Sequence, residues 1–170
     1  CATRAAVVLA LLLWLSEPAG AKAVVTGITG PTFNLVAGKA YINTPDGDSM
    51  LIWGYRDAQG GTPIQYPGPT LIVNQGDTVT INVRNTLNVP VSLVFPGQSG
   101  VTATGAGGIP GLLTTEVPPD NGVTVVTYSF VAAEPGTYLY QSGTNPELQI
   151  EMGLVGALIV RPMTAPFGPN

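Results

Sequence analysis

Residues 66–84 read YPGPTLIVNQGDTVTINVR, an apolar run and an alternating run on either side of a tight turn. In the second run Val79, Ile81 and Val83 alternate with polar side chains, and this period of two predicts a half-buried strand. Between the runs, residues 74–77 have the amide, glycine and aspartate side chains that favour turns. Similar alternation at residues 126–130, with further turn signals, predicts roughly seven to nine short strands in an all-β sandwich or Greek-key barrel.

Other local patterns complete this prediction. Residues 45–48 (PDGD) predict a hairpin turn that joins a strand at 39–43 to one at 50–55. Asn145, Pro146 and Glu147 suit a helix start, so one short helix is expected near residues 145–151. Residues 154–160 are nearly all apolar, which is typical of a strand buried on both faces. The glycine-rich stretch 97–111 is expected to be a long exposed loop.

Composition excludes several classes of function. Only 9% of the 170 residues are charged, against about 25% in ordinary soluble domains. The net charge of −4, without a basic run, excludes a nucleic-acid binder. The chain has no histidine and its one cysteine is Cys1, which excludes histidine bases, Ser–His and Cys–His pairs, histidine-bound metals and internal disulfides. We therefore expect no catalytic residue and no metal ligand in this segment.

The first 23 residues predict a secretory signal peptide. Arg4 precedes an apolar run at 5–15, and the small-x-small tripeptide 21–23 follows. Such a run rises only about 16 Å as a helix, too little for a hydrocarbon core of roughly 30 Å. The protein is expected to be secreted or periplasmic, without a membrane segment once the leader is removed. One domain then spans residues 24–162, and the proline-rich residues 163–170 are expected to link it to a missing downstream domain. Because the chain does not begin with Met, we interpret it as a fragment.

Four stretches resemble, in order and spacing, the N-terminal (plastocyanin-like, type 3) cupredoxin domain of multicopper oxidases. They are residues 66–79 with the Pro-Gly-Pro strand and Gly-Asp turn, residues 85–92, residues 134–140 (EPGTYLY) and residues 152–160 (MGLVGALIV). This resemblance implies a cupredoxin-like Greek-key sandwich between Tyr66 and Pro162. At the family level it also implies copper-dependent oxidation of phenolic, metal-ion or amine substrates, often coupled to oxygen reduction.

The resemblance breaks down where the family binds copper. Its two His-x-His pairs match Val94 and Pro96 in one stretch, and Gln141 and Gly143 in another. Valine, proline and glycine have no side-chain donor atom, and an amide is a poor copper ligand. The resemblance therefore implies a front domain without copper ligands and without a cofactor of its own. Any copper of the parent protein would then be bound downstream of Asn170.

Such a domain would have a structural role, packing against downstream cupredoxin domains of the same chain. We expect Val94, Phe95, Gln141 and Ser142 to lie near that contact. The alternative is a secreted module without enzymatic activity, used for surface assembly or for ligand binding. Its stacking residues for a sugar would come from four aromatics, namely Trp53, Tyr55, Tyr138 and Tyr140. Whether the parent is an oxidase, its substrate and its oligomeric state stay open at this point.

Overall fold

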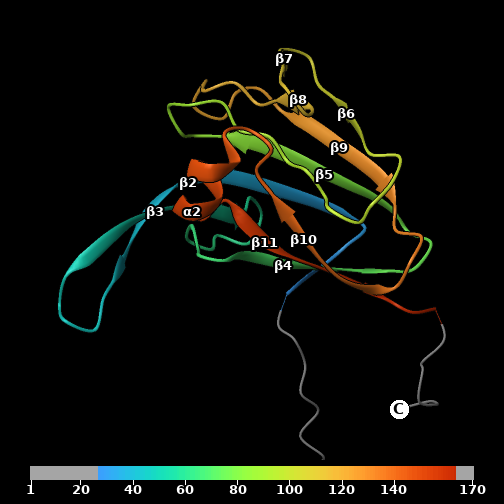
Figure 1. The fold of residues 1–170 in the computed structure, drawn as a ribbon, viewed down its shortest axis with the longest axis horizontal. Coiled ribbons are helices and arrows are strands. Elements are labelled where there is room, and N and C mark those ends of the chain that lie inside the picture. Colours follow the sequence, from blue (N-terminus) through green and yellow to red (C-terminus); the bar gives the residue numbers. More distant parts are fainter. Residues whose placement is uncertain (1–26, 164–170) are drawn as a thin grey trace, which may run out of the picture.

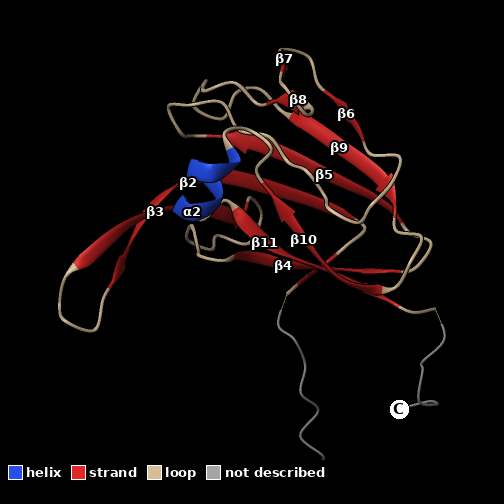
Figure 2. Ribbon diagram, in the orientation of Figure 1, coloured by secondary structure: helices blue, strands red, loops and turns tan. Residues whose placement is uncertain are grey.

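The computed structural model describes residues 27–163, in which two β-sheets pack face to face (Figures 1 and 2). The predicted signal peptide and most of the predicted linker lie outside the described residues. One sheet has the strand order β1-β4-β11-β10, the other has β3-β2-β5-β9-β6, and β7 and β8 form a separate hairpin. The strands are β1 (Ile28–Thr29), β2 (Thr32–Asn43), β3 (Ser49–Asp57), β4 (Gly68–Asn74), β5 (Thr78–Asn85), β6 (Thr102–Thr104), β7 (Ile109–Pro110), β8 (Thr115–Glu116), β9 (Val126–Val131), β10 (Gly136–Gln141) and β11 (Val155–Arg161).

Both sheets mix parallel and antiparallel pairs, and this arrangement confirms the predicted cupredoxin-like Greek-key class. β4 pairs in parallel with β1 and β11, and β2 pairs in parallel with β5, whereas the hairpin partners are antiparallel. The alternation predicted for residues 78–84 is confirmed, because Val79, Ile81 and Val83 are fully buried in the core between the sheets. Apolar burial of this kind supplies most of the stability of a sandwich.

The predicted hairpin and helix are also confirmed. β2 and β3 pair from Leu35 opposite Asp57 out to Asn43 opposite Ser49. The helix is α2 (Pro146–Met152), which lies at one end of the sandwich (Figure 2). The expected side-chain cap is wrong, however. Asn145 has a left-handed backbone with φ 44° and makes no side-chain cap bond, while its backbone carbonyl accepts hydrogen bonds from the amides of Leu148 and Gln149.

Two expectations need correction. The stretch 97–111 is not one long loop, because it contains β6, which pairs with β9 at the sheet edge, and β7, which pairs with β8. Glycine-rich loop composition did not reveal these pairings: β6 depends on a partner 27 residues away at Ser129, and β7 and β8 are too short to show an alternating pattern. Strand β11 is not buried on both faces either. Its residues alternate between buried and half-buried, because only one face of its sheet packs against the other sheet. No helix among residues 27–163 is long and apolar enough to cross a membrane.

Candidate functional site

The structure brings together the two segments that the resemblance predicts to match the family's copper-ligand positions. Val94 and Gln141 form an isolated antiparallel bridge, in which the Val94 amide donates to the Gln141 carbonyl at 2.8 Å. The Gln141 amide donates back to the Val94 carbonyl at 3.1 Å. Gln141 is the last residue of β10, so Gly143 comes just beyond this bridge, and Pro96 follows Val94 on the other segment. All four positions therefore lie at the same end of the sandwich.

Gly143 is buried against these neighbours. A Cβ atom added to it would lie 2.7 Å from Val94 Cγ1, 3.1 Å from Ser92 Oγ and 3.6 Å from Leu113 Cδ1. The first distance is shorter than real side-chain contacts allow, so the place that a larger side chain would need is already filled by Val94. A larger residue at position 143 would therefore require Val94 to move.

A buried hydrogen-bond network supports this end from beneath. Ser142 Oγ donates to Gln149 Oε1 at 2.6 Å and accepts from the Thr144 amide at 3.1 Å. Gln149 Nε2 donates to the Pro90 carbonyl at 2.9 Å, which anchors α2 to the segment before Val94. Polar groups buried in this way stabilise a fold only when they are paired, as Ser142 and Gln149 are.

A second branch of this network joins the β7–β8 hairpin to the segments that carry Ser92 and Thr144. Thr144 Oγ1 lies 2.8 Å from Glu116 Oε1 and 2.9 Å from Ser92 Oγ. Since a threonine hydroxyl has one proton and a carboxylate only accepts, Thr144 donates to Glu116 and Ser92 donates to Thr144. Sequence reasoning missed Glu116, Thr144 and Gln149. Thr144 and Gln149 directly follow the 141–143 stretch, but no local pattern marks Glu116.

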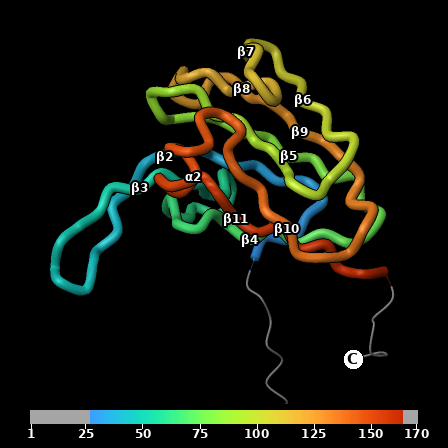
Figure 3. The backbone as a smooth tube through the Cα atoms, viewed as in Figure 1, coloured from blue at the N-terminus to red at the C-terminus, as the bar shows by residue number. Residues whose placement is uncertain are grey.

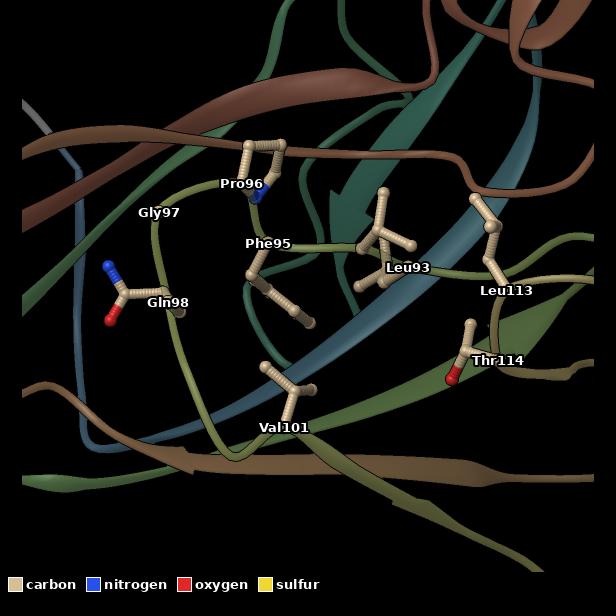
Figure 4. Close-up of a pocket in the computed structure, with 9 residues that line it drawn as sticks. Leu93, Phe95, Pro96, Gly97, Gln98, Val101, Leu113 and Thr114 are labelled. Atoms are coloured by element: carbon tan, nitrogen blue, oxygen red, sulfur yellow. The ribbon is translucent and has the colours of Figure 1, made fainter.

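The outer side of this end is a shallow cleft of about 310 Å³, whose lining combines apolar side chains with polar groups (Figure 4). Its lining residues are Leu93, Val94, Phe95, Pro96, Gly97, Gln98, Val101, Leu113 and Thr114. Beside it, the tip of the β7–β8 hairpin exposes 95% of Leu112 and 63% of Leu113. We call Val94, Pro96, Val101, Leu112 and Leu113 the leucine surface. Leu113 lines the cleft and Leu112 adjoins it, and exposed apolar residues gathered in this way mark interaction sites.

The predicted contact residues do not all reach this surface. Val94 and Gln141 are half-buried, whereas Phe95 is 4% exposed and Ser142 is fully buried. Phe95 packs inward against Phe130, with ring centroids 4.9 Å apart, and against Tyr128. Phe95 and Ser142 therefore support the leucine surface from within the domain.

The residues at this end do not fit copper. Copper sites use imidazole, thiolate or thioether donors, and Val94, Pro96 and Gly143 have no side-chain donor. Among residues 27–163, no group of three His, Cys, Asp or Glu side chains could hold a metal ion.

Burial argues against the aromatic sugar-binding alternative. Tyr55 and Tyr140 are fully buried, with ring centroids 5.6 Å apart, so neither can stack on a sugar that arrives from solvent. Burial raises the pKa of Tyr55 well above its ordinary value of 10.0, and it raises the pKa of Tyr140 as well. Both rings are neutral core residues. Trp53 and Tyr138 are half-buried and pack against the core.

Comparisons with known proteins agree with the fold. A family model described as "Multicopper oxidase" matches residues 58–165. The chain is 30% identical over 137 residues to Copper resistance protein A of Escherichia coli, a match that covers 81% of this chain and 20% of that protein. It is 36% identical over 118 residues to Laccase-1 of Emericella nidulans, covering 65% of this chain and 19% of that protein. The chain thus spans about a fifth of the length of these relatives.

Solved structures give the same result. The crystal structure of a multi-copper oxidase from Pseudomonas thermotolerans matches with a TM-score of 0.64 and 25% identity, covering 82% of this chain and 31% of that chain. The Blue Copper Oxidase from Nitrosomonas europaea matches with a TM-score of 0.62 and 26% identity, covering 80% of this chain and 40% of that chain. Both matches cover most of this chain and a minority of the other protein.

Proposed function

Because this chain belongs to the multicopper oxidase family, we propose that it is the copper-free front domain of a longer, secreted or periplasmic oxidase-like protein. Its role is structural: it covers a downstream cupredoxin domain of the same chain. Copper-dependent oxidation, as the names of its relatives suggest, would use ligands outside this segment. The length of those relatives, about five times that of the matched part, supports the existence of further domains.

The observation that carries this proposal is the leucine surface, at the end of the sandwich where the resemblance predicts the family's ligand positions. Leu112 is 95% exposed, which leaves nearly its whole side chain in water. Covering such a side chain contributes roughly 1.5–3 kcal/mol to an association. The adjacent Val94 and Pro96 make this end apolar where the resemblance places imidazoles. An apolar end suits packing against another domain and does not suit metal binding.

The network beneath the surface supports the same role. Glu116, Thr144 and Ser92 tie the β7–β8 hairpin to the segments on either side of the Val94–Gln141 bridge. The hairpin that presents Leu112 and Leu113 is therefore held to the body of the domain. Preorganised contact residues lose less conformational entropy on binding.

Metal content tests the copper-free part of the proposal. The purified protein is incubated with Cu(II) or with Cu(I), desalted and analysed by atomic emission. We expect substoichiometric copper that EDTA removes. Retention of one copper per chain, lost in a variant at Gln141 such as Gln141→Leu, would overturn this part.

Substitution at the hairpin tip tests the interface part. Leu112→Lys is compared with Leu139→Lys, which replaces a 49% exposed leucine of β10 outside the leucine surface. In this chain alone both changes should alter stability by no more than about 0.5 kcal/mol, as is usual for surface positions. In the longer gene product, calorimetry of the Leu112→Lys protein should show a separate unfolding transition for the front domain. The Leu139→Lys protein should unfold as the unchanged protein does. Unchanged, fully coupled unfolding of the Leu112→Lys protein would refute the interface.

A further inference from the structure

The β2–β3 hairpin extends beyond the body of the domain (Figures 1 and 3). β2 pairs with β5 only as far as Ala37, opposite Asn85, whereas its pairing with β3 continues to Asn43. Gly38 and Gly54 face each other where the ribbon leaves the body. We call residues 39–51 the arm. From Lys39 to Asn43 it runs about 13 Å, at roughly 3.3 Å per residue.

The arm exposes large apolar side chains on both faces. Tyr41 is 69% exposed and lies opposite Leu51, which is 40% exposed, so these two share one face. Met50, at 50% exposure, lies opposite Ile42 on the other face. A two-stranded ribbon is at best marginally stable in water. An apolar ribbon in this position is stabilised when another surface covers it.

The outer edge of the arm is open to pairing or packing. Residues 49–52 (SMLI) contain neither charge nor proline, the devices with which natural proteins protect an edge strand. The covering segment begins only at Tyr55, which bridges to Gln65. The arm also stands apart from the β7–β8 hairpin (Figure 1), so it is a surface separate from the leucine surface.

Charge along the arm is self-complementary. Lys39 lies at the base, on the same face as Tyr41, and Asp46 and Asp48 lie at the exposed tip. The hydrogen bond from the Thr44 hydroxyl lowers the pKa of Asp46 below its ordinary value of 3.8. Two arms that lie antiparallel therefore bring the base of each to the tip of the other, whereas parallel arms would bring like charges together.

We propose that the arm binds the arm of a second copy of this chain, antiparallel, with the Tyr41–Leu51 faces in contact around a twofold axis. The contact is isologous, since each copy contributes the same residues. Each Lys39 lies beside the acidic tip of the other copy, and the apolar pairs fill the centre. This association goes beyond the proposed role of the leucine surface and does not depend on it.

The expected dimer is reversible. Two arm faces bury less than the roughly 1,200 Å² at which stable standard interfaces begin, so the dissociation constant should be micromolar or weaker. Sedimentation velocity of the purified protein, from about 1 to about 500 µM, should show the average mass rising from monomer toward dimer. Monomer at every concentration would overturn the proposal.

Matched variants localise the contact. Leu51→Lys should weaken the dimer at least about tenfold, because it places like charges at the twofold axis. Leu139→Lys, a leucine of similar exposure on β10, should leave it unchanged. If both substitutions weakened the dimer equally, the arm would not be the dimer contact.

A charge exchange tests the antiparallel arrangement without changing the apolar faces. Lys39→Glu should weaken the dimer, and adding Asp46→Lys with Asp48→Lys should restore it. These positions are exposed, so the fold should be kept, which circular dichroism checks. Failure of the triple variant to recover association would rule out the antiparallel pairing.

Discussion

Tyr55 and Tyr140 together test how much a buried hydrogen bond contributes to the stability of the core. The Tyr55 side chain is fully buried, and its hydroxyl has no hydrogen-bond partner among the described residues. The neighbouring Tyr140 is equally buried, but its hydroxyl donates to the Pro69 carbonyl at 2.7 Å. The two ring centroids are 5.6 Å apart. Tyr55→Phe and Tyr140→Phe therefore remove the same atom from nearly the same environment, one unpaired and one paired.

The two substitutions should change the free energy of unfolding differently. Burying a hydroxyl without a partner costs about 1–3 kcal/mol in proteins, so Tyr55→Phe should leave stability unchanged or raise it by up to about 2 kcal/mol once the small void is counted. Tyr140→Phe breaks a buried hydrogen bond and should lower stability by about 1–3 kcal/mol. For a domain of this size each kcal/mol corresponds to roughly 3–5 °C in Tm.

Urea unfolding followed by tryptophan fluorescence, together with thermal scans, measures both variants against the unchanged protein. Equal m-values would show that only stability differs. If Tyr55→Phe destabilises the protein as much as Tyr140→Phe does, the Tyr55 hydroxyl has a partner such as a buried water, and the reasoning is refuted.

Three further predictions concern the buried tyrosines and the end of the sandwich around the Val94–Gln141 bridge. Burial raises the pKa of Tyr55, Tyr128 and Tyr140 above 10.0, so above that pH the unfolded chain loses these protons while the folded chain keeps them. The free energy of unfolding should therefore be constant with respect to these groups below about pH 10 and should fall above it by about 1.4 kcal/mol per pH unit for each tyrosine. Urea midpoints at successive pH values measure this. Gly143→Ala should lower the free energy of unfolding by about 1–3 kcal/mol, because its Cβ would lie 2.7 Å from Val94 Cγ1. In a double-mutant cycle, Val94→Ala should recover part of that loss, whereas additive effects of the two substitutions would contradict the contact. Thr144→Val should cost about 1–3 kcal/mol, because it leaves the Glu116 carboxylate and the Ser92 hydroxyl without their partner. The control is Thr137→Val, at an exposed residue of β10, and chemical unfolding that shows the same stability for both variants would argue against the network.

Much of the fold could be predicted from local patterns. The alternation at Val79, Ile81 and Val83, the turn at 45–48 and the proline at the start of α2 are short-range signals, and each produced the expected element. The exceptions depended on partners that no local pattern marks. β6 and β7 exist because β9 and β8 lie beside them, and the Asn145 side chain was not needed as a cap because its backbone carbonyl serves the first turn.

The same division holds for the candidate site. The amino-acid sequence by itself determined that no histidine is available, and its resemblance to the family predicts that Val94, Pro96, Gln141 and Gly143 occupy the ligand positions. Only the tertiary structure decided that Val94 bridges Gln141, that Gly143 is closed in by Val94, and that Phe95 and Ser142 face inward. It also decided that Leu112 and the arm are exposed. The physical reason is that residue chemistry and periodicity are properties of neighbours along the chain, whereas burial, close packing and hydrogen-bond partners arise only when distant strands meet.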